Sequence, residues 1–173
     1  MVRTIKPLGL VLICFAFILS SCGIYTFNDV SIPDGVKTVR IGFIENKARY
    51  INPSLSAQLT DAFVKKVNSQ TKLTRIDDLN ADYVINAEIT GYDVSTSGVG
   101  GDHQASLNRL TVSVHMTFID NHDAENRQTN EYDVSSSFDF SASQSLAQAE
   151  TALMPQILKD LPDAMFNKVF SNW

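Results

Sequence analysis

The sequence predicts an α+β domain in which two helices pack on one face of a mostly antiparallel, four- to five-stranded sheet. Two observations predict this class. Several stretches alternate apolar and polar residues, as half-buried strands do, and two stretches repeat apolar residues every three or four positions, as helices do. Their order is strand, helix, a run of strands, helix, which is typical of helices gathered on one side of a sheet.

The first strand is expected at 37–44, followed by a helix over about 53–70. Asn52 is a suitable N-cap for this helix, and Pro53 fits its first position, where the missing N–H costs no hydrogen bond. The strand should bury Val39, Ile41 and Phe43. The helix carries one apolar stripe at helical spacing, made of Leu55, Leu59, Ala62, Phe63 and Val67.

Further strands are expected at 71–76, 81–94, 107–120 and 131–140. Between two of them, the segment 95–102 holds three glycines among small polar residues, which predicts a flexible loop. The strand at 107–120 alternates most regularly, with Leu110, Val112, Val114, Met116 and Phe118 on one face and Arg109, Thr111, Ser113, His115 and Thr117 on the other. One buried face and one wet face indicate an antiparallel sheet.

A second helix is expected near the C-terminus, with Ser143 or Ser145 as its cap. Pro155 and Pro162 interrupt it, and each removes a helical hydrogen bond. A kinked helix or two short helices are therefore expected in place of one straight rod. The stripe that should face the sheet consists of Leu146, Ala149, Leu153, Ile157, Leu161, Met165 and Val169.

The N-terminus has the layout of a secretory signal: a short positive segment, then an apolar run at 8–19 that falls short of the about 20 residues of a membrane span. Leu-Ser-Ser-Cys at 19–22 resembles a bacterial lipobox, in which the cysteine becomes the first mature residue and carries acyl chains such as palmitate. An ordinary cleaved signal with a chance cysteine is the alternative. The lipobox interpretation gives a cleaved signal peptide at 1–21 and a single domain at 22–173, lipidated at Cys22.

Composition narrows the possible partners of this domain. Loss of Arg3 and Lys6 with the signal leaves 12 of the 14 basic residues against 19 acidic ones, a net charge of −7. An acidic chain without a basic cluster is a poor nucleic-acid binder. Cys14 is also lost, so no disulfide framework is expected. Because no other apolar stretch approaches spanning length, the lipid is the expected membrane anchor.

No segment carries a recognisable catalytic, metal or cofactor motif. The three histidines lack the close spacing of a zinc site. The turn at 120–126 is rich in oxygen ligands but lacks the glycine and the distal glutamate of a calcium loop, so an ordinary acidic turn is favoured. Basic residues within 37–49 and 65–75 suit the phosphates of lipid headgroups, although a solvated surface explains them as well.

Several stretches span nearly the whole domain in a familiar order: "CGIYTF" after the lipidation site, "FIENKARYINPSLS", "EITGYDVS", "LNRLTVSVHMTFID" and "FNKVFSNW". Together they resemble a divergent form of the LptE family of lipopolysaccharide-assembly lipoproteins. The resemblance implies a lipid-anchored domain of two helices on a sheet, without enzymatic activity or cofactor. It also implies an outer-membrane protein that faces the periplasm and plugs an LptD-type β-barrel during lipopolysaccharide assembly. Among functional residues, the match carries over Cys22 alone.

The expected contact site is the end of the sheet at 95–104. A small, polar hairpin tip suits the polar, partly wet lumen of a barrel. We expect Ser97, Asp102 and His103 to contact the barrel, with Arg109 just behind them and lipopolysaccharide as a further candidate ligand. The alternative is a periplasmic lipid-anchored binding module for another amphiphile. An enzyme whose site no motif reveals is the third hypothesis.

Overall fold

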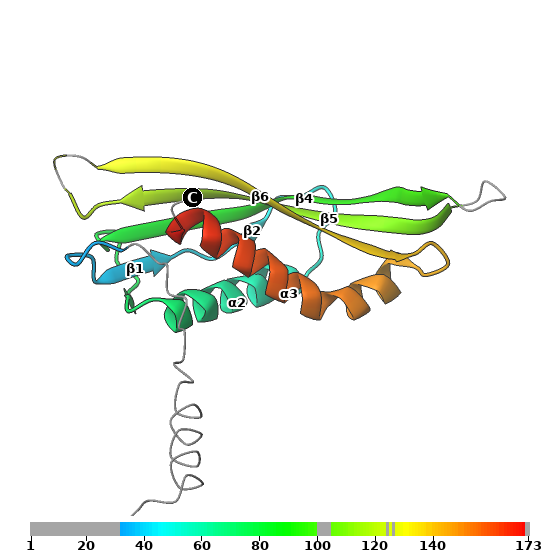
Figure 1. Cartoon of the computed structure of the whole chain (residues 1–173), viewed down its shortest axis with the longest axis horizontal. Helices are drawn as coiled ribbons and strands as arrows, with labels where there is room; N and C mark the ends of the chain where they lie inside the picture. The colour runs from blue at the N-terminus through cyan, green and yellow to red at the C-terminus, as the bar shows by residue number, and fades with distance from the viewer. Residues whose placement is uncertain (1–31, 100–104, 124, 126, 172–173) are drawn as a thin grey trace, which may run out of the picture.

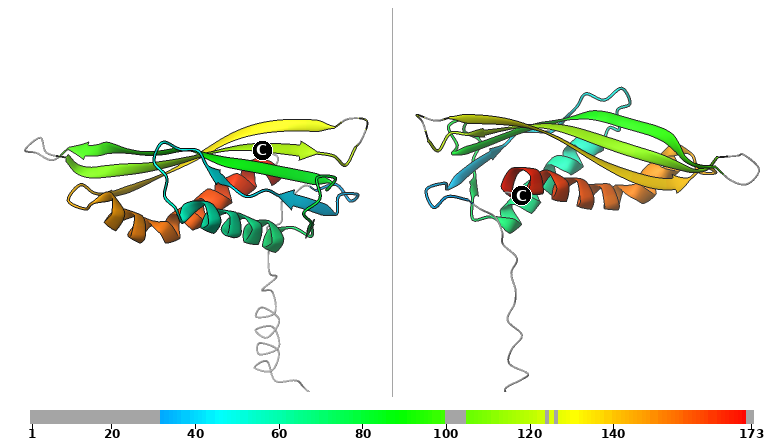
Figure 2. Two further views of the ribbon diagram at one scale, coloured as in Figure 1. Left: turned by 180° about the vertical axis from the view of Figure 1, so that it is seen from behind. Right: turned by 45° about the horizontal axis from the view of Figure 1, so that its top comes forward.

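Two helices lie together on one face of a sheet (Figures 1 and 2). The computed structural model describes residues 32–99, 105–123, 125 and 127–171. The strands are β1 (Thr38–Ile41), β2 (Glu45–Asn46), β3 (Thr74–Arg75), β4 (Tyr83–Val99), β5 (Ala105–Asp120) and β6 (Gln128–Ser141), and the helices are α2 (Leu55–Gln70) and α3 (Leu146–Phe170). The predicted α+β class is confirmed, with six strands in the described part in place of four or five.

The sheet joins a long antiparallel meander to a short parallel part. Its strand order is β3-β1-β4-β5-β6, and β2 also pairs with β4. The meander consists of β4, β5 and β6, whose registers place Tyr83 opposite Asp120 and Asp120 opposite Gln128. β1 and β2 pair with β4 in parallel, as β3 does with β1. Helix α2 connects β2 to β3 and returns the chain to the same end of the sheet, which a parallel pair requires.

The hydrophobic core fills the space between the meander and the two helices. We call this side of the sheet the helix face and the other side the open face. The inward residues predicted for β5 are all buried, and they are Leu110, Val112, Val114, Met116 and Phe118. The helices contribute Leu55, Leu59, Phe63 and Val67 from α2, and Ala149, Ile157, Leu161 and Met165 from α3.

Helix α2 begins two residues later than its sequence predicts. Ser54, rather than Asn52, is the N-cap residue, and its side chain makes no cap hydrogen bond. Asn52 is buried, and its Oδ1 accepts from Ser54 N at 3.1 Å and from Ser54 Oγ at 3.0 Å. The side chain therefore closes a turn ahead of the helix instead of capping it, a use of Asn that competes with the N-cap role.

Helix α3 is unbroken, so of the two expected forms, a kinked helix or two short helices, the second is wrong. Both Pro155 and Pro162 lie inside the 25-residue helix. Buried residues on both sides of each proline, such as Ala149, Ile157 and Met165, hold the helix against the sheet, and this packing outweighs the lost hydrogen bonds. The start is as predicted, because the Ser145 hydroxyl accepts from the N–H of Gln148 in a capping box.

The first strand is shorter than predicted, and Phe43 does not join the core. β1 ends with Ile41 opposite Ile85, and β2 begins with Glu45 opposite Glu88. The chain therefore advances four residues from β1 to β2 while β4 advances three, which leaves one extra residue between β1 and β2. The extra residue reverses the alternation: Ile44 is fully buried, and Phe43 is 61% exposed. Strand alternation alone cannot reveal such an irregularity.

Two other segments, 95–102 and 71–76, also differ from expectation. The flexible loop predicted at 95–102 is wrong in its first half, because β4 continues to Val99 and pairs Ser95 with Arg109. Register shifts near Gly98 show how small residues permit this irregular pairing. The strand expected at 71–76 is shorter than predicted and consists of the two residues of β3.

Asp82 joins β1 to β4 at the start of the parallel pair. Its Oδ2 accepts at 2.8 Å from the N–H of Lys37, the N–H of Thr38 and the hydroxyl of Thr38. These donors lower the pKa of Asp82, chiefly through the Lys37 N–H. The Asp82 carboxylate therefore provides hydrogen-bond acceptors for the N–H groups of Lys37 and Thr38, where the parallel pairing of β1 and β4 begins.

Candidate functional site

The open face of the meander is a polar surface that strand alternation creates. The side chains that point away from the helices are Arg109, Thr111, Ser113, His115 and Thr117 on β5 and Glu131, Asp133, Ser135, Ser137 and Asp139 on β6. β4 contributes Asn86, Glu88, Asp93 and Ser95 beside them. Apolar side chains return at the β1 end, where Val84 lies opposite Ile119. Most of this face therefore offers hydroxyl and charged groups to a partner.

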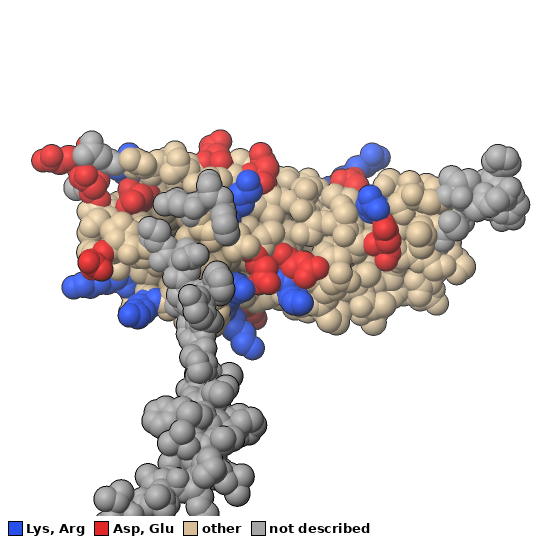
Figure 3. Space-filling model, in the orientation of Figure 1, with Lys and Arg blue, Asp and Glu red and all other residues tan. Residues whose placement is uncertain are grey.

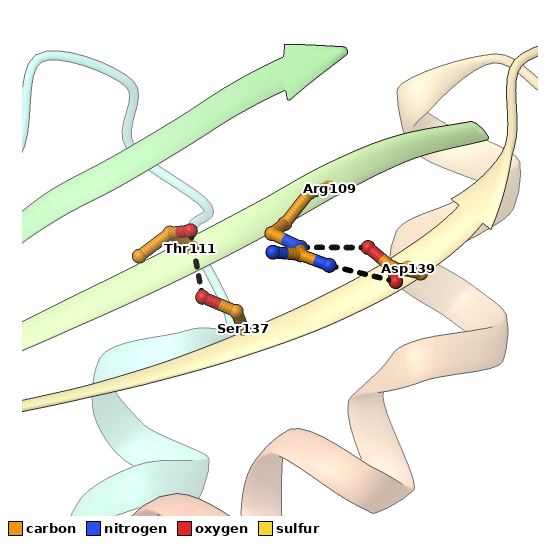
Figure 4. Close-up of polar contacts among 4 residues, drawn as sticks. All are labelled: Arg109, Thr111, Ser137 and Asp139. Carbon is orange, nitrogen blue, oxygen red and sulfur yellow. Dashed lines mark hydrogen bonds and ion pairs between the residues drawn. The ribbon is translucent and has the colours of Figure 1, made fainter. Parts of the chain in front are cut away.

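Arg109 and Asp139 form a two-pronged ion pair near the β4–β5 turn (Figure 4). Nε donates to Oδ1 at 2.8 Å and Nη2 donates to Oδ2 at 3.0 Å. The Arg109 guanidinium holds the pKa of Asp139 below its usual value, and the Ser97 hydroxyl lowers it further. Both side chains are nearly half exposed, so solvent screens the pair and its contribution to stability is small.

Cross-strand pairs continue along the open face toward the middle of the meander. The hydroxyls of Thr111 and Ser137 lie 2.9 Å apart (Figure 4). His115 Nδ1 lies 2.9 Å from Asp133 Oδ1, and this contact raises the pKa of the imidazole. These pairs fix the side chains of an exposed surface in defined positions, which reduces the entropy lost when a partner covers them.

Two of the four predicted contact residues meet at one point. Ser97 from β4 and Arg109 from β5 both reach Asp139 of β6. Asp102 and His103 lie outside the described residues, as does Cys22. Sequence reasoning missed Asp139, which follows Arg109 by 30 residues. Its place on a polar strand face was predictable, but its register opposite Arg109 was not, because a slip of one residue reverses the facing side.

A pocket lies at the other end of the domain, between the start of the described chain and the α2–β3 turn. It is lined by Ile32, Pro33, Asp34, Val36, Lys37, Gln70, Thr71, Lys72, Leu73 and Thr74. The pairing of β1 with β3 brings together Lys37 and Lys72, which come from the two basic segments of the sequence. Figure 3 shows Lys and Arg side chains along the lower margin of the molecule, on the helix side of the sheet.

The described part of the chain contains neither a metal-binding cluster nor a membrane-spanning helix. No three or more His, Cys, Asp or Glu side chains there are grouped to hold a metal ion. None of its helices is both long and apolar enough to cross a bilayer. The open face and the Lys37–Lys72 pocket are therefore the two candidate surfaces for function.

Comparison with known families decides what kind of protein carries these surfaces. The family model for LptE, described as lipopolysaccharide-assembly, matches residues 36–169. This chain belongs to the LptE family. The match runs from the residue before Lys37 almost to the end of α3, so it includes the whole meander and both helices of this LptE protein. The family functions in lipopolysaccharide assembly and is not a family of enzymes. No curated protein sequence matches the chain.

Solved structures of bacterial lipoproteins share the fold of this LptE protein. The rare lipoprotein B of Shewanella oneidensis has a TM-score of 0.50 at 11% identity, over 75% of this chain and 92% of that one. A minor lipoprotein of Acinetobacter baumannii has a TM-score of 0.51 at 15% identity, over 77% and 91%. Lipoprotein B of Nitrosomonas europaea has 0.51 at 16%, over 78% and 83%. At such identities the likeness concerns the fold alone.

Proposed function

We propose that this LptE protein is an outer-membrane lipoprotein, anchored through acylated Cys22 and facing the periplasm, that plugs an LptD-type β-barrel during lipopolysaccharide assembly. The observation that carries the proposal is the open face. The side chains of the helix face are buried in the core, whereas the open face presents ordered hydroxyls and ion pairs. A barrel lumen is itself polar and wet, so the two surfaces match in chemistry.

The length of the meander supports a plug that extends through a barrel. β5 has 16 residues, which at strand rise corresponds to roughly 50 Å. The apolar band of an outer-membrane barrel is only about 25 Å tall. A sheet of this length spans the band and still extends beyond it, so contacts are expected along the whole open face.

The position of the tether agrees with this orientation. The described chain begins at Ile32 beside β1, at the opposite end of the sheet from the β4–β5 turn (Figure 1). Ten residues separate Ile32 from Cys22, a reach of at most about 35 Å. An anchored Cys22 therefore keeps the β1 end near the inner surface of the membrane and leaves the β4–β5 end free to enter the lumen.

Site-specific photocrosslinking in cells tests the plug. Probes at Ser97, Thr111 and Ser137 sample the open face, and probes at Asp102 and His103 sample the predicted tip. Exposed Lys159 on α3 is the matched control on the helix side. We expect crosslinks to an LptD-type barrel from the open face and none from Lys159. Crosslinks from Lys159 without any from the open face would reverse the docking side, and silence at every position would exclude the barrel partner.

A second function, binding of another phosphate-bearing amphiphile, is favoured by the Lys37–Lys72 pocket. Apolar Val36 and Leu73 line it together with the two lysines, and no ion pair of the described residues engages either lysine. Native mass spectrometry of the purified full chain reports any retained lipid. If this function holds, Lys37→Ala with Lys72→Ala removes the lipid while the barrel crosslinks persist. A chain that carries no lipid, or a variant that keeps it, rejects this second function.

A further inference from the structure

The outer edge of β6 is a long row of backbone groups without partners in the described part of the protein. β6 is the last strand of the sheet, and it pairs with β5 through 14 consecutive positions without a register shift. No described strand flanks its other side. Figure 1 shows β6 along one border of the sheet, with α3 beneath it. The opposite border consists of the two-residue β3, which is too short to pair with much, and of β4 beyond Ile89, whose pairing with β5 is irregular.

The register identifies which residues turn their backbone outward. Asn121 N donates to Asp82 O at 2.7 Å, and Tyr83 lies opposite Asp120, so odd-numbered residues of β5 bond toward β4. Even-numbered residues of β5 then bond to β6, where their partners are also even-numbered. The N–H and C=O groups of the odd-numbered residues of β6 therefore point away from the sheet: Thr129, Glu131, Asp133, Ser135, Ser137 and Asp139.

Of the usual protections against strand pairing, this edge has only charged side chains, its three carboxylates. Natural edge strands are blunted by lysine, proline, bulges or shortness. β6 contains no lysine or proline, is 14 residues long and has no bulge against β5. No hydrogen bond of the described residues joins α3 to its backbone. A straight edge of this length is a template for pairing with another strand, so the fold is suited to receive one.

Charge decides what kind of strand fits. β6 holds three carboxylates, Glu131, Asp133 and Asp139, and no basic residue. A second copy of β6 paired antiparallel about Ser135 would place Glu131 opposite Asp139 of the other copy, and like charges directly opposite are unfavourable. A strand with Lys or Arg on the open face would instead place positive charges beside these carboxylates, and opposite charges attract. Its alternate side chains would lie on the helix face beside half-buried Tyr132, where apolar residues fit.

We propose that the β6 edge binds an extended segment of another protein, in which basic residues alternate with apolar ones, by strand addition to the sheet. The main-chain bonds come from the outward groups of residues such as Ser135 and Ser137. The carboxylates of β6 select the basic side chains, Glu131 and Asp133 more than Asp139, which already pairs with Arg109. This inference does not rest on the proposed plug function, because its main-chain bonds form at the edge of the sheet, although the selecting carboxylates belong to the open face.

The test uses the full chain in detergent and a short end-capped peptide in which Lys alternates with Val; a Glu–Val peptide is the control. We expect the Lys peptide to bind and to slow hydrogen exchange at the N–H of Ser135 and Ser137. The N–H groups of Val134 and Ser136 already bond to β5 and should be protected without peptide. The Glu peptide should bind at least about tenfold more weakly.

Matched variants separate the edge from the side chains. Ser135→Pro with Ser137→Pro removes two outward N–H groups and should abolish binding, whereas Ser135→Ala with Ser137→Ala keeps them and should bind as the native chain does. If the proline variant does not fold, Ser135→Lys with Ser137→Lys should weaken Lys-peptide binding about tenfold by repulsion. The proposal is overturned if the Lys peptide does not bind or if the folded proline variant binds it normally. It is also overturned if sedimentation reveals a dimer that these variants dissociate, since the occupant would then be a second copy.

Discussion

At the scale of single residues, Asp82 makes the parallel part of the sheet sensitive to acid. Its folded pKa lies below the ordinary value of 3.8 because it accepts hydrogen bonds from Lys37 and Thr38. A depressed carboxyl pKa contributes stability at neutral pH that is lost as the pH falls through the folded pKa. The loss should therefore occur below about pH 4.

Asp82→Asn tests this assignment. Asn keeps one acceptor oxygen but no charge, so we expect lower stability at pH 7 and a flatter decline of stability with acid below about pH 4. Urea unfolding at a series of pH values measures both. Asp61→Asn, at an exposed position of α2, is the control and should change neither. Identical acid profiles for native and Asp82→Asn chains would show that the hydrogen bonds to Asp82 carry no charge-dependent stability.

Tyr92 links the sheet to α3 through its hydroxyl. The ring is buried, and its OH donates to Glu150 Oε1 at 2.8 Å. Burial is the main cause that raises the pKa of Tyr92, so the hydroxyl stays protonated and remains a donor. Tyr92→Phe should cost about 1.5 kcal/mol, the value of a hydrogen bond to a charged group.

Denaturant melts compare this variant with Tyr132→Phe. Tyr132 is half-buried and its hydroxyl makes no hydrogen bond to the described residues, so its loss should change the free energy of unfolding by less than about 0.5 kcal/mol. Equal losses in both variants would mean that the bond to Glu150 adds nothing specific.

At the scale of elements, α3 is held in place by its buried stripe. Ile157 lies between the two prolines and is fully buried. Ile157→Ala should therefore cost about 2–5 kcal/mol through lost burial and a new cavity. Lys159→Ala, two residues further on an exposed side of the helix, should stay within about 0.5 kcal/mol. Equilibrium unfolding in urea measures both, and a loss under half a kcal/mol for Ile157→Ala would contradict the packing described here.

Periodicity predicts the elements well where a buried face is continuous. The alternation of β5 is as expected, and so is most of each helix stripe, because residues on the inward side meet the same core. Ala62 lies outside the core, Leu146, Leu153 and Val169 are only half-buried, and Phe166 and Phe170 are buried although the predicted stripe omits them. The prediction is wrong where the ladder is irregular, as at Phe43, and the alternative of two short helices is wrong because packing holds α3 unbroken. The strand character of Ser95 and Ser97 depends on pairing with β5, which local composition does not encode.

The candidate site is predictable only in part for the same reason. Alternation predicts that Arg109 and Thr111 face solvent, and they do lie on the open face. Their partners Asp139 and Ser137 depend on the register between β5 and β6, and the unpaired edge of β6 depends on the order of strands in the sheet. Both are properties of the assembled sheet, so no single segment of sequence reveals them.

At the scale of the whole molecule, the proposed lipid anchor at Cys22 would determine where the domain acts. If Cys22 is acylated, the mature chain begins there and stays with membranes, since two or more acyl chains give stable anchoring. Cys22→Ser should leave an uncleaved precursor or a soluble form in cell fractionation. Mass spectrometry of the native N-terminus gives the direct check, and an unmodified mature terminus at another residue would refute lipidation.

The parallel pairing of β1 with β4 also sets an order of events in folding. β4 pairs with β5, and β5 pairs with β6, so these three strands can close as two successive hairpins. β1 must wait for a strand far downstream: Thr38 meets Asp82 across 44 residues, and closing a loop of that size is slow compared with a hairpin. We therefore expect β1, the first strand of the described part of the chain, to dock after the meander, which leaves Val39 and Ile41 available to chaperones until the meander has formed.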